Sequence, residues 1–320
     1  MFRSVSIAAA LAVGLSTPSF AATVDAREML RDFSVIALGD HSLLSDTPAP
    51  VYVGGDFPDG TVGDVSGALV VGGKIKSSRN TNVKGNVVIG DSQSVTQPNP
   101  GQRRFEVAGS TGPTTFDLQR NGTTVASGQP VPVDAVRKAF TTLSSDLAKL
   151  EDTGTTFGGD MNNRVLKASA GSDGIAVAKL DSGAFNTFFT GGGSRMFDLG
   201  GASTLIINAD LGGIADFTFE ALNINDFNAA NNVILNLSGV DRFTIRSTFG
   251  ISLLAPTVDV FANAGGTNAF MVADDLEQRY EIRKPFTGDL PDPSPVPLPA
   301  SLWLLGMGVA GLGVLRRRRA

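Results

Sequence analysis

A short β-branched run that ends in glycine recurs at a fixed interval, and this repeat constrains the fold more than any other feature of the chain. The three copies are residues 51–56 (VYVGGD), 69–74 (LVVGGK) and 87–91 (VVIGD). Gly54, Gly72 and Gly90 are therefore 18 residues apart, twice. Each copy predicts a short strand followed by a sharp turn.

A constant period of this size is typical of a β-solenoid, in which coils stack and equivalent apolar side chains line up inside. Glycine at one corner of each coil permits a positive φ or a close approach of neighbouring backbone. A plain β-meander with glycine turns is the alternative that three copies leave open. The sequence predicts a mostly β fold, a β-solenoid with one packed amphipathic helix, followed by a C-terminal transmembrane helix.

The middle of the chain holds a helical pattern. Val136, Phe140, Leu143, Leu147 and Leu150 follow steps of four and three and form one apolar face. We expect Asp134 to cap the start of this helix and Gly154 to stop it. The polar stretch before it, 98–128, predicts an excursion or a hairpin, with weak strand signals at 105–107 and 115–118.

Strand patterns return after residue 190, at 203–208, 216–219, 232–237, 242–247 and 257–261. Asn208, Asn223, Asn225 and Asn236 punctuate them, and stacked asparagines form hydrogen-bonded ladders inside β-helices. The spacing is irregular, so this half alone fits a solenoid or a sandwich equally well. Gly191 to Gly193 predict a flexible turn.

The composition excludes several function classes. The chain has no cysteine and one histidine, His41, which excludes disulfide scaffolds, thiol enzymes and cysteine-based metal sites. Five of its 26 basic residues, Arg3 and Arg316 to Arg319, lie at the two ends, which leaves 21 against 31 acidic residues, about −10. An acidic body of this kind argues against nucleic-acid binding.

Residues 1–21 predict a signal peptide. Arg3 supplies the positive start, 7–15 form the apolar stretch, and Ser19-Phe20-Ala21 places small residues where signal peptidase requires them. Cleavage is expected between Ala21 and Ala22. An N-terminal core helix is the alternative.

The C-terminal end has the composition of a second targeting segment. Residues 292–300 are rich in proline, 301–315 are almost wholly apolar, and 316–320 form a basic tail. The uncharged stretch is close to the ~20 residues that cross a bilayer. The arginine cluster would stay on the cytoplasmic side. We therefore expect an exported body, 22–291, held by a transmembrane helix.

This tail resembles a known sorting signal. Val296-Pro297-Leu298-Pro299-Ala300, the apolar stretch and Arg316-Arg317-Arg318-Arg319 follow the order of the VPLPA-CTERM form of the PEP-CTERM signals. The resemblance implies an exosortase-type sorting enzyme as a partner and cleavage near the VPLPA motif, so that anchoring in the inner membrane is transient. A permanent single-span anchor is the alternative.

The body resembles the choice-of-anchor A family of bacterial surface proteins. The resemblance lies in 33–40 (FSVIALGD), the glycine repeats, the helix near 140–150, 253–256 (LLAP) and 286–291 (FTGDLP). It implies a β-helical adhesin domain that is exported to the cell surface.

Carboxylate chemistry is the remaining enzymatic possibility. Asp40, Asp56 and Asp91, with Lys74 at the same corner, could form a ladder, and Asp56 could pair with Lys74. β-Helical lyases and glycosidases use such clusters. Asp56, Asp59 and Asp64 offer oxygen ligands for calcium, but their spacing matches no calcium motif. We expect His41 to be a loop residue, exposed or locally hydrogen-bonded, without a catalytic role.

The sequence therefore predicts a secreted, non-catalytic adhesin, without cofactor or metal, that acts at the cell surface or in a biofilm matrix. Matrix exopolysaccharide is the expected ligand class. A polysaccharide-active enzyme and a purely structural matrix protein are the competing hypotheses.

Overall fold

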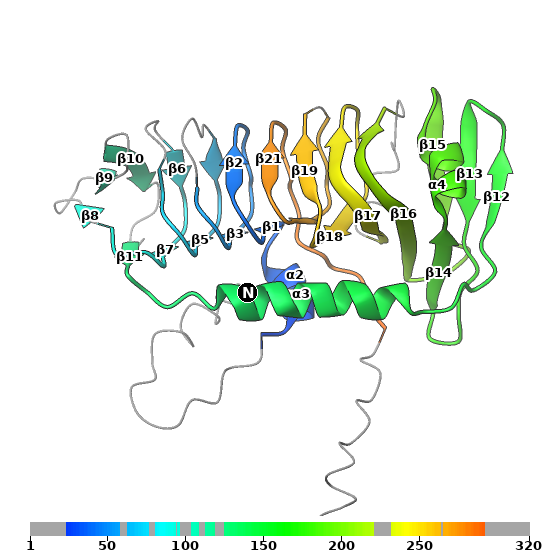
Figure 1. Ribbon diagram of the computed structural model, residues 1–320, viewed down its shortest axis with the longest axis horizontal. Coiled ribbons are helices and arrows are strands. Elements are labelled where there is room, and N and C mark those ends of the chain that lie inside the picture. The colour runs from blue at the N-terminus through cyan, green and yellow to red at the C-terminus, as the bar shows by residue number, and fades with distance from the viewer. Residues whose placement is uncertain are drawn as a thin grey trace, which may run out of the picture. The chain divides into compact units, whose positions relative to one another are not determined.

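The computed structural model describes residues 24–57, 63–76, 81–93, 95–96, 104–108, 113–118, 125–220, 232–263 and 265–291. The chain divides into two units, Met1–Asp289 and Leu290–Ala320, and nearly all described residues belong to the first. The described part is mostly β, with one large parallel sheet, two smaller sheets and three helices (Figure 1).

The N-terminal half begins with helix α2 (Ala26–Asp32), which Asp25 caps by accepting the backbone N–H of Arg27 at 2.8 Å. Short strands follow. They are β1 (Val35–Ala37), β2 (His41–Leu43), β3 (Val51–Val53), β4 (Asp64–Val65), β5 (Leu69–Val71), β6 (Thr81–Val83), β7 (Val87–Ile89), β8 (Val95–Thr96), β9 (Arg104–Ala108), β10 (Pro113–Leu118) and β11 (Val125–Ser127). The predicted hairpin before the long helix is confirmed as the antiparallel pair β9–β10.

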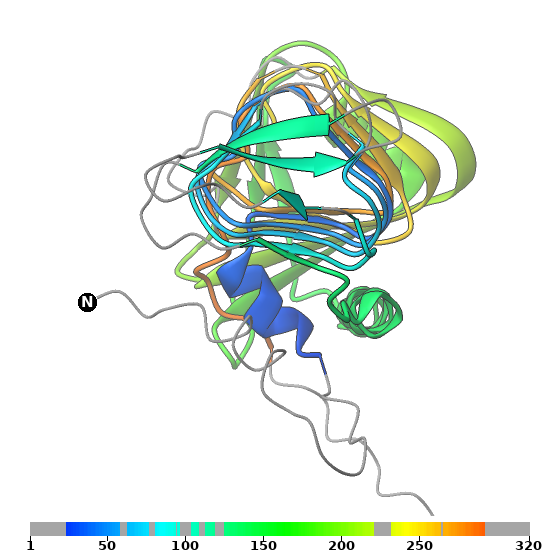
Figure 2. The ribbon, with the colours of Figure 1, turned by 90° about the vertical axis from the view of Figure 1, so that its left-hand side faces the viewer.

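The 18-residue repeat is confirmed as the register of the parallel sheet. Val51 of β3 lies beside Leu69 of β5, which lies beside Val87 of β7. Because parallel strands cannot be joined by hairpin turns, this pairing excludes the β-meander alternative. Viewed along the stack, successive coils superpose, and α2 and α3 lie against the same side (Figure 2).

The order of the coils in space differs from their order in the chain. Strands β1, β3, β5, β7 and β11 step away from the middle of the stack, and helix α3 (Val133–Ala148) then runs back along its side (Figure 1). The second half builds inward from the far end. Its elements are β12 (Thr156–Gly159), β13 (Asn163–Lys167), β14 (Ile175–Leu180), α4 (Ser182–Phe189), β15 (Ser194–Asp198), β16 (Thr204–Phe219), β17 (Val233–Ile245), β18 (Ser252–Ala255), β19 (Asp259–Ala262), β20 (Met271–Ala273) and β21 (Leu276–Gln278).

The last coil closes the stack against the first. Val35 of β1 pairs with Met271 of β20 on one side and with Val51 of β3 on the other. Leu235, Leu253 and Met271 are aligned in register, so the interval from 235 to 253 and from 253 to 271 is again 18 residues. The sequence prediction did not include these two intervals.

The long helix packs where its apolar face predicts. Val136, Phe140, Leu143 and Leu147 are buried. Both predicted boundaries are wrong. Pro132, not Asp134, is the N-cap residue, and it makes no side-chain capping hydrogen bond. Asp134 lies in the first turn, where a negative charge is favourable to the helix dipole. The helix ends at Ala148, and Gly154 lies in a later turn with a φ of 90°.

In two places, two strands that were predicted separately form one continuous strand. The segments at 203–208 and 216–219 form one strand, β16, with a bulge between Asp210 and Ile214, and those at 232–237 and 242–247 form β17. The sequence prediction also missed helix α4, although Asp181 caps it and Phe185, Phe188 and Phe189 form a buried helical face.

Asparagine stacking is confirmed for one pair. Asn236 Nδ2 donates to Asn208 Oδ1 at 2.8 Å and to the carbonyl of Ser144 in α3 at 2.9 Å. Asn208 Nδ2 donates to the carbonyl of Leu147 at 2.7 Å. The two asparagines therefore hold the C-terminal half of α3 against the sheet. Asn223 and Asn225 lie outside the described residues.

The predicted glycine turn is ordered around an arginine. Arg195 is fully buried and donates to the carbonyls of Phe188, Thr190, Gly191 and Gly193. Gly191 and Gly193 have positive φ values, which let the loop wrap around the guanidinium group.

Candidate binding face

One side of the stack carries polar side chains in columns. The second halves of β16 and β17 form it together with β19, β21 and β2. The register places Asp216 beside Arg242 and Arg242 beside Asp259. Side chains alternate along a strand, so these residues point outward while Phe243 and Val260 fill the core. We call this side the binding face, with a first column of Asp216, Arg242, Asp259, Asp275, Asp40 and Asp56, and a second column of Thr218, Thr244, Phe261, Glu277 and Ser42.

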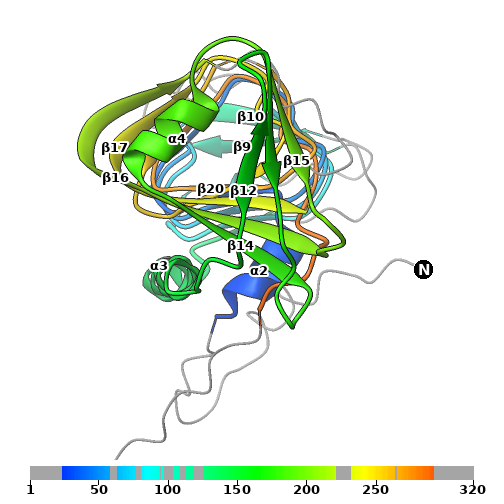
Figure 3. The same ribbon diagram turned by 90° about the vertical axis from the view of Figure 1, so that its right-hand side faces the viewer.

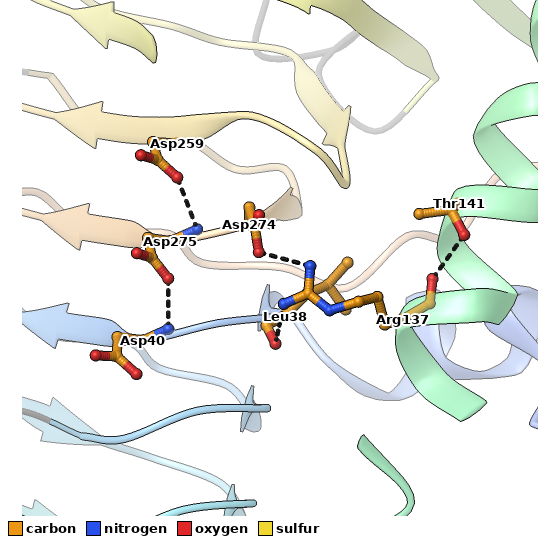
Figure 4. Close-up of polar contacts among 7 residues, drawn as sticks. All are labelled: Leu38, Asp40, Arg137, Thr141, Asp259, Asp274 and Asp275. Carbon is orange, nitrogen blue, oxygen red and sulfur yellow. Dashed lines mark hydrogen bonds and ion pairs between the residues drawn. The ribbon is translucent and has the colours of Figure 1, made fainter. Parts of the chain in front are cut away.

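The first column contains a ladder of four aspartates, Asp259, Asp275, Asp40 and Asp56. Each carboxylate accepts the backbone N–H at the equivalent position of the next coil. Asp259 accepts from Asp275 at 3.4 Å, and Asp275 accepts from Asp40 at 2.7 Å (Figure 4). Asp40 accepts from Asp56 at 2.7 Å, and Asp56 accepts from Lys74 at 2.7 Å. The ladder therefore runs across the junction between the last coil and the first.

The predicted ladder is confirmed in part. Asp40, Asp56 and Lys74 do share one corner. Lys74 contributes its backbone, however, and the carboxylate of Asp56 pairs with the side chain of Lys76, so the predicted Asp56–Lys74 side-chain pair is wrong. Asp91 takes part through its backbone: its N–H donates to the carbonyl of Gly73 at 3.4 Å, and its own carbonyl accepts from the N–H of Gly128 at 3.0 Å. The sequence prediction did not include Asp259 and Asp275. The available signal was the 18-residue interval that separates Leu253 and Met271, which lie on the strands before these two aspartates.

Glycine makes room for the ladder. A side chain at Gly55 would collide with the carboxylate of Asp40, and one at Gly73 with that of Asp56. A side chain at Gly54 or Gly72 would strike a backbone carbonyl of the preceding coil. None of these four glycines has a positive φ, so the repeat requires glycine for close approach of neighbouring coils and not for a left-handed turn.

The pKa values of two ladder carboxylates are shifted in opposite directions. Partial burial raises the pKa of Asp275, and the neighbouring carboxylates of Asp259, Asp40 and Asp274 raise it further. The pKa of Asp56 is lowered despite the opposing effect of partial burial, because its carboxylate accepts the N–H of Lys74 and pairs with Lys76. Negative charge is therefore concentrated near the junction of the two halves.

The second column places an aromatic ring among charges. The guanidinium carbon of Arg279 lies 4.9 Å from the centre of the Phe261 ring, and Arg279 Nε donates to Glu277 at 2.8 Å. Phe261 and Glu277 occupy equivalent positions on neighbouring coils. This part of the face offers a partly exposed ring with hydrogen-bond donors and acceptors beside it.

Helix α3 locks the junction from the adjoining side. Arg137 Nη1 donates to Asp274 Oδ1 at 2.7 Å and Nη2 donates to the carbonyl of Leu38 at 2.9 Å (Figure 4). Leu38 belongs to the first coil and Asp274 to the last, so one side chain joins the two halves.

The expected position of His41 is wrong. His41 is fully buried in strand β2, where Nε2 lies 3.2 Å from Gln278 Oε1 and the ring packs against Phe57. Burial lowers the pKa of His41 to about 4. Its register partner is Leu276, and backbone hydrogen bonds place Phe57 at the same position of the next coil. His41 is therefore a neutral core residue.

The structure gives no support to a calcium site at Asp56, Asp59 and Asp64. The backbone N–H of Asp64 donates to Asp46 at a corner away from the ladder, and Asp59 lies outside the described residues. Within the described part of the chain, no group of three or more acidic or histidine side chains is arranged to hold a metal ion.

The predicted terminal sites lie outside the described residues. These are the cleavage site at Ala21 and Ala22, the VPLPA motif at 296–300, the apolar stretch at 301–315 and the arginines at 316–319. Among the described helices, none is long and apolar enough to cross a membrane.

Comparison with known families gives two matches. A family model described as "Putative Ice-binding-like adhesive domain" matches residues 26–284, and the model of the PEP-CTERM protein-sorting motif matches residues 295–319. A comparison with curated proteins finds no match. The first match spans both halves of the stack and the binding face.

Proposed function

Because this chain belongs to the family of ice-binding-like adhesive domains, we propose that it is a non-catalytic adhesin of the cell surface that holds its ligand on the binding face. The family match over residues 26–284 is the observation that carries this proposal. The sorting motif marks the chain for export and for processing by an exosortase.

We assign the ends of the chain as follows. Signal peptidase cuts between Ala21 and Ala22, and the body, 22–291, is a β-solenoid of the choice-of-anchor A type. The 18-residue register on both sides of the junction supports the solenoid assignment. The VPLPA motif follows a proline-rich linker, the segment 301–315 anchors the chain transiently in the inner membrane, and the basic tail, 316–320, stays in the cytoplasm.

The chemistry of the face favours binding over catalysis. The ladder carboxylates are engaged by backbone N–H groups of the next coil, so they stack along one face and do not converge on a shared point, whereas a glycosidase needs two carboxyls facing one bond. Asp216, Arg242 and Asp259 alternate in charge along the column. Such a surface presents donors and acceptors at a regular spacing to a repeating, hydroxyl-rich ligand. Matrix polysaccharide fits this description, and many weak contacts gain strength through avidity.

The test is glycan binding by the exported protein. Arg242→Gln removes the cation of the first column, and Arg31→Gln, at an exposed position of α2, is the matched control. We expect saturable binding to matrix polysaccharide that Arg242→Gln weakens and Arg31→Gln leaves unchanged. Release of cleaved sugar would show the competing enzyme, and a complete absence of saturable binding would show a structural matrix protein. Either result overturns the proposal.

A further inference from the structure

Strand β12 and helix α4 lie at the end of the stack (Figure 3). Residues of both elements line a groove. Its volume is ≈ 540 Å³. Strand β12 and its turn form one wall and α4 the other. The lining residues are Phe157, Gly158, Gly159, Asp160, Met161, Arg164, Ala184, Thr187 and Phe188.

Strand β12 is an open edge. It is the outer strand of the three-stranded sheet β12–β13–β15, and within the described residues it pairs only with β13. In an antiparallel pair, alternate residues direct their N–H and C=O groups away from the partner strand. A groove between such an edge and a helix is the geometry in which an extended peptide adds a strand to a sheet.

Apolar side chains stand exposed at this groove. Phe157 is 52% exposed and Met161 is 78% exposed. The ring of Phe157 packs against the ring of Phe188 in α4, with centres 5.6 Å apart. This contact holds the Phe157 side chain in place. The described part of the chain exposes four large apolar side chains, Phe157, Met161, Met196 and Ile214. Two of the four lie at this groove.

The groove also has a positive charge available. Arg164 uses Nη1 to donate to the carbonyl of Thr190 at 3.0 Å, and its register partner is another arginine, Arg195. Asp160 is engaged by the backbone N–H groups of Asn162 and Asn163, both at 2.8 Å. No carboxylate forms an ion pair with Arg164 among the residues that the structure describes. Asp160 adds a negative charge to the same lining, so an acidic group of an occupant is favoured beside Arg164.

The chain itself contains a segment with these properties. Proline occupies positions 291, 293, 295, 297 and 299, which leaves N–H donors only at the alternate residues. An extended segment of this kind pairs through one edge alone, because prolines are tolerated in a sheet only where their N–H side faces solvent. The donor-bearing residues are Leu290, Asp292, Ser294, Val296, Leu298 and Ala300, so the pairing edge includes one acidic and several apolar residues.

We propose that segment 290–300 of a second copy of this chain adds to the open edge of β12 and lies in the groove, with Asp292 near Arg164. The contact joins the tail of one molecule to the end of another. Because it is heterologous, it links copies into chains and not into closed pairs.

Site-directed cross-linking tests this contact, since the protein has no cysteine. Full-length protein with Thr187→Cys, which lines the groove, is mixed under mild oxidation with full-length protein carrying Ser294→Cys. Asn186→Cys, exposed on the same helix but outside the groove, is the matched control. We expect the mixed dimer to form about tenfold faster with Thr187→Cys than with Asn186→Cys, because docking raises the effective concentration. Asp292→Asn in the tail donor, which leaves the body unaltered, is expected to slow this reaction severalfold.

Three outcomes would overturn the proposal. Equal rates at positions 186 and 187, or a rate that Asp292→Asn leaves unchanged, would show that the tail does not dock there. Rapid self-linking of the Thr187→Cys protein in place of the mixed dimer would show that two grooves meet instead.

Discussion

The carboxylate of Asp275 accepts the backbone N–H of Asp40 at 2.7 Å, although 235 residues separate the two in the chain. Asp275 belongs to the last coil and Asp40 to the first. The stack is therefore closed in its middle, where the two ends of the body meet, and not at one of its tips. Stability should depend on this junction more than on either outer end.

Substitution of Asp275 separates the role of its oxygen from that of its charge. Asp275→Ala leaves the N–H of Asp40 without its acceptor and should cost about 1 kcal/mol in the free energy of unfolding. Asp275→Asn keeps an acceptor oxygen and relieves the repulsion from Asp259, Asp40 and Asp274 that raises the pKa of Asp275, so it should cost less or even stabilise. Urea unfolding measures both.

Asp216→Ala is the control for this pair, because it lies in the same outward column and is exposed. It should change stability little. If Asp275→Asn were as destabilising as Asp275→Ala, the charge of Asp275 would matter more than its acceptor oxygen, contrary to this prediction.

Substitution of a corner glycine tests the close approach of coils. A β-carbon at Gly72 would lie against the carbonyl oxygen of Gly54 and a methyl group of Val133. Gly72→Ala should therefore cost about 3 kcal/mol or prevent folding. Thermal unfolding followed by circular dichroism measures the effect.

The same substitution at Gly183, in helix α4, should act in the opposite direction. Its β-carbon would make only ordinary contacts, and alanine favours a helix over glycine by up to about 1 kcal/mol. Equal effects at the two sites would show that the corner glycines are not required for stacking.

Buried His41 should make stability depend on pH. Its pKa is about 4 in the folded protein and 6.5 in the unfolded chain. Between these values the unfolded chain binds more protons, so stability falls as pH falls from 6.5 towards 4, by about 3 kcal/mol in all. Chemical unfolding at several pH values measures this loss.

His41→Leu is the matched variant, because Leu276 and Phe57 hold the equivalent core positions in the neighbouring coils. Carboxylates also titrate near pH 4, so the informative quantity is the difference in the free energy of unfolding between the two proteins. That difference should change by about 3 kcal/mol over this window. A constant difference would mean that folding does not lower the pKa of His41.

The sequence predicted those parts of the fold that local periodicity determines. The 18-residue interval at 51–91 appears as register, and the apolar face of 136–147 is the face that α3 buries. The position of the first coil beside the last was not predictable, because it depends on pairing between Val35 and Met271 across the whole chain.

The candidate site was predicted only in half. Asp40 follows Gly39 and Asp56 follows Gly54-Gly55, whereas no glycine lies just before Asp259 or Asp275. His41 was misplaced because a polar residue beside glycine and aspartate is typical of a loop, and nothing local shows that Gln278 will supply its partner inside the core. Capping of α4 by Asp181 was a local signal that the strand patterns around it obscured.

Processing of the tail should remove the only tryptophan of the protein, Trp303. If an exosortase cuts near 296–300, the released protein begins at Ala22, ends at or before Ala300 and retains Tyr52 and Tyr280 as its absorbing phenol groups. Its fluorescence should then lack tryptophan emission. Intact mass of the released and the inner-membrane fractions measures both ends of the chain.

A variant with Pro297→Ala and Pro299→Ala should keep Trp303 in the membrane fraction. Released protein that still shows tryptophan emission would contradict cleavage at this motif, and full retention of Trp303 in the inner membrane of the unaltered protein would indicate a permanent anchor.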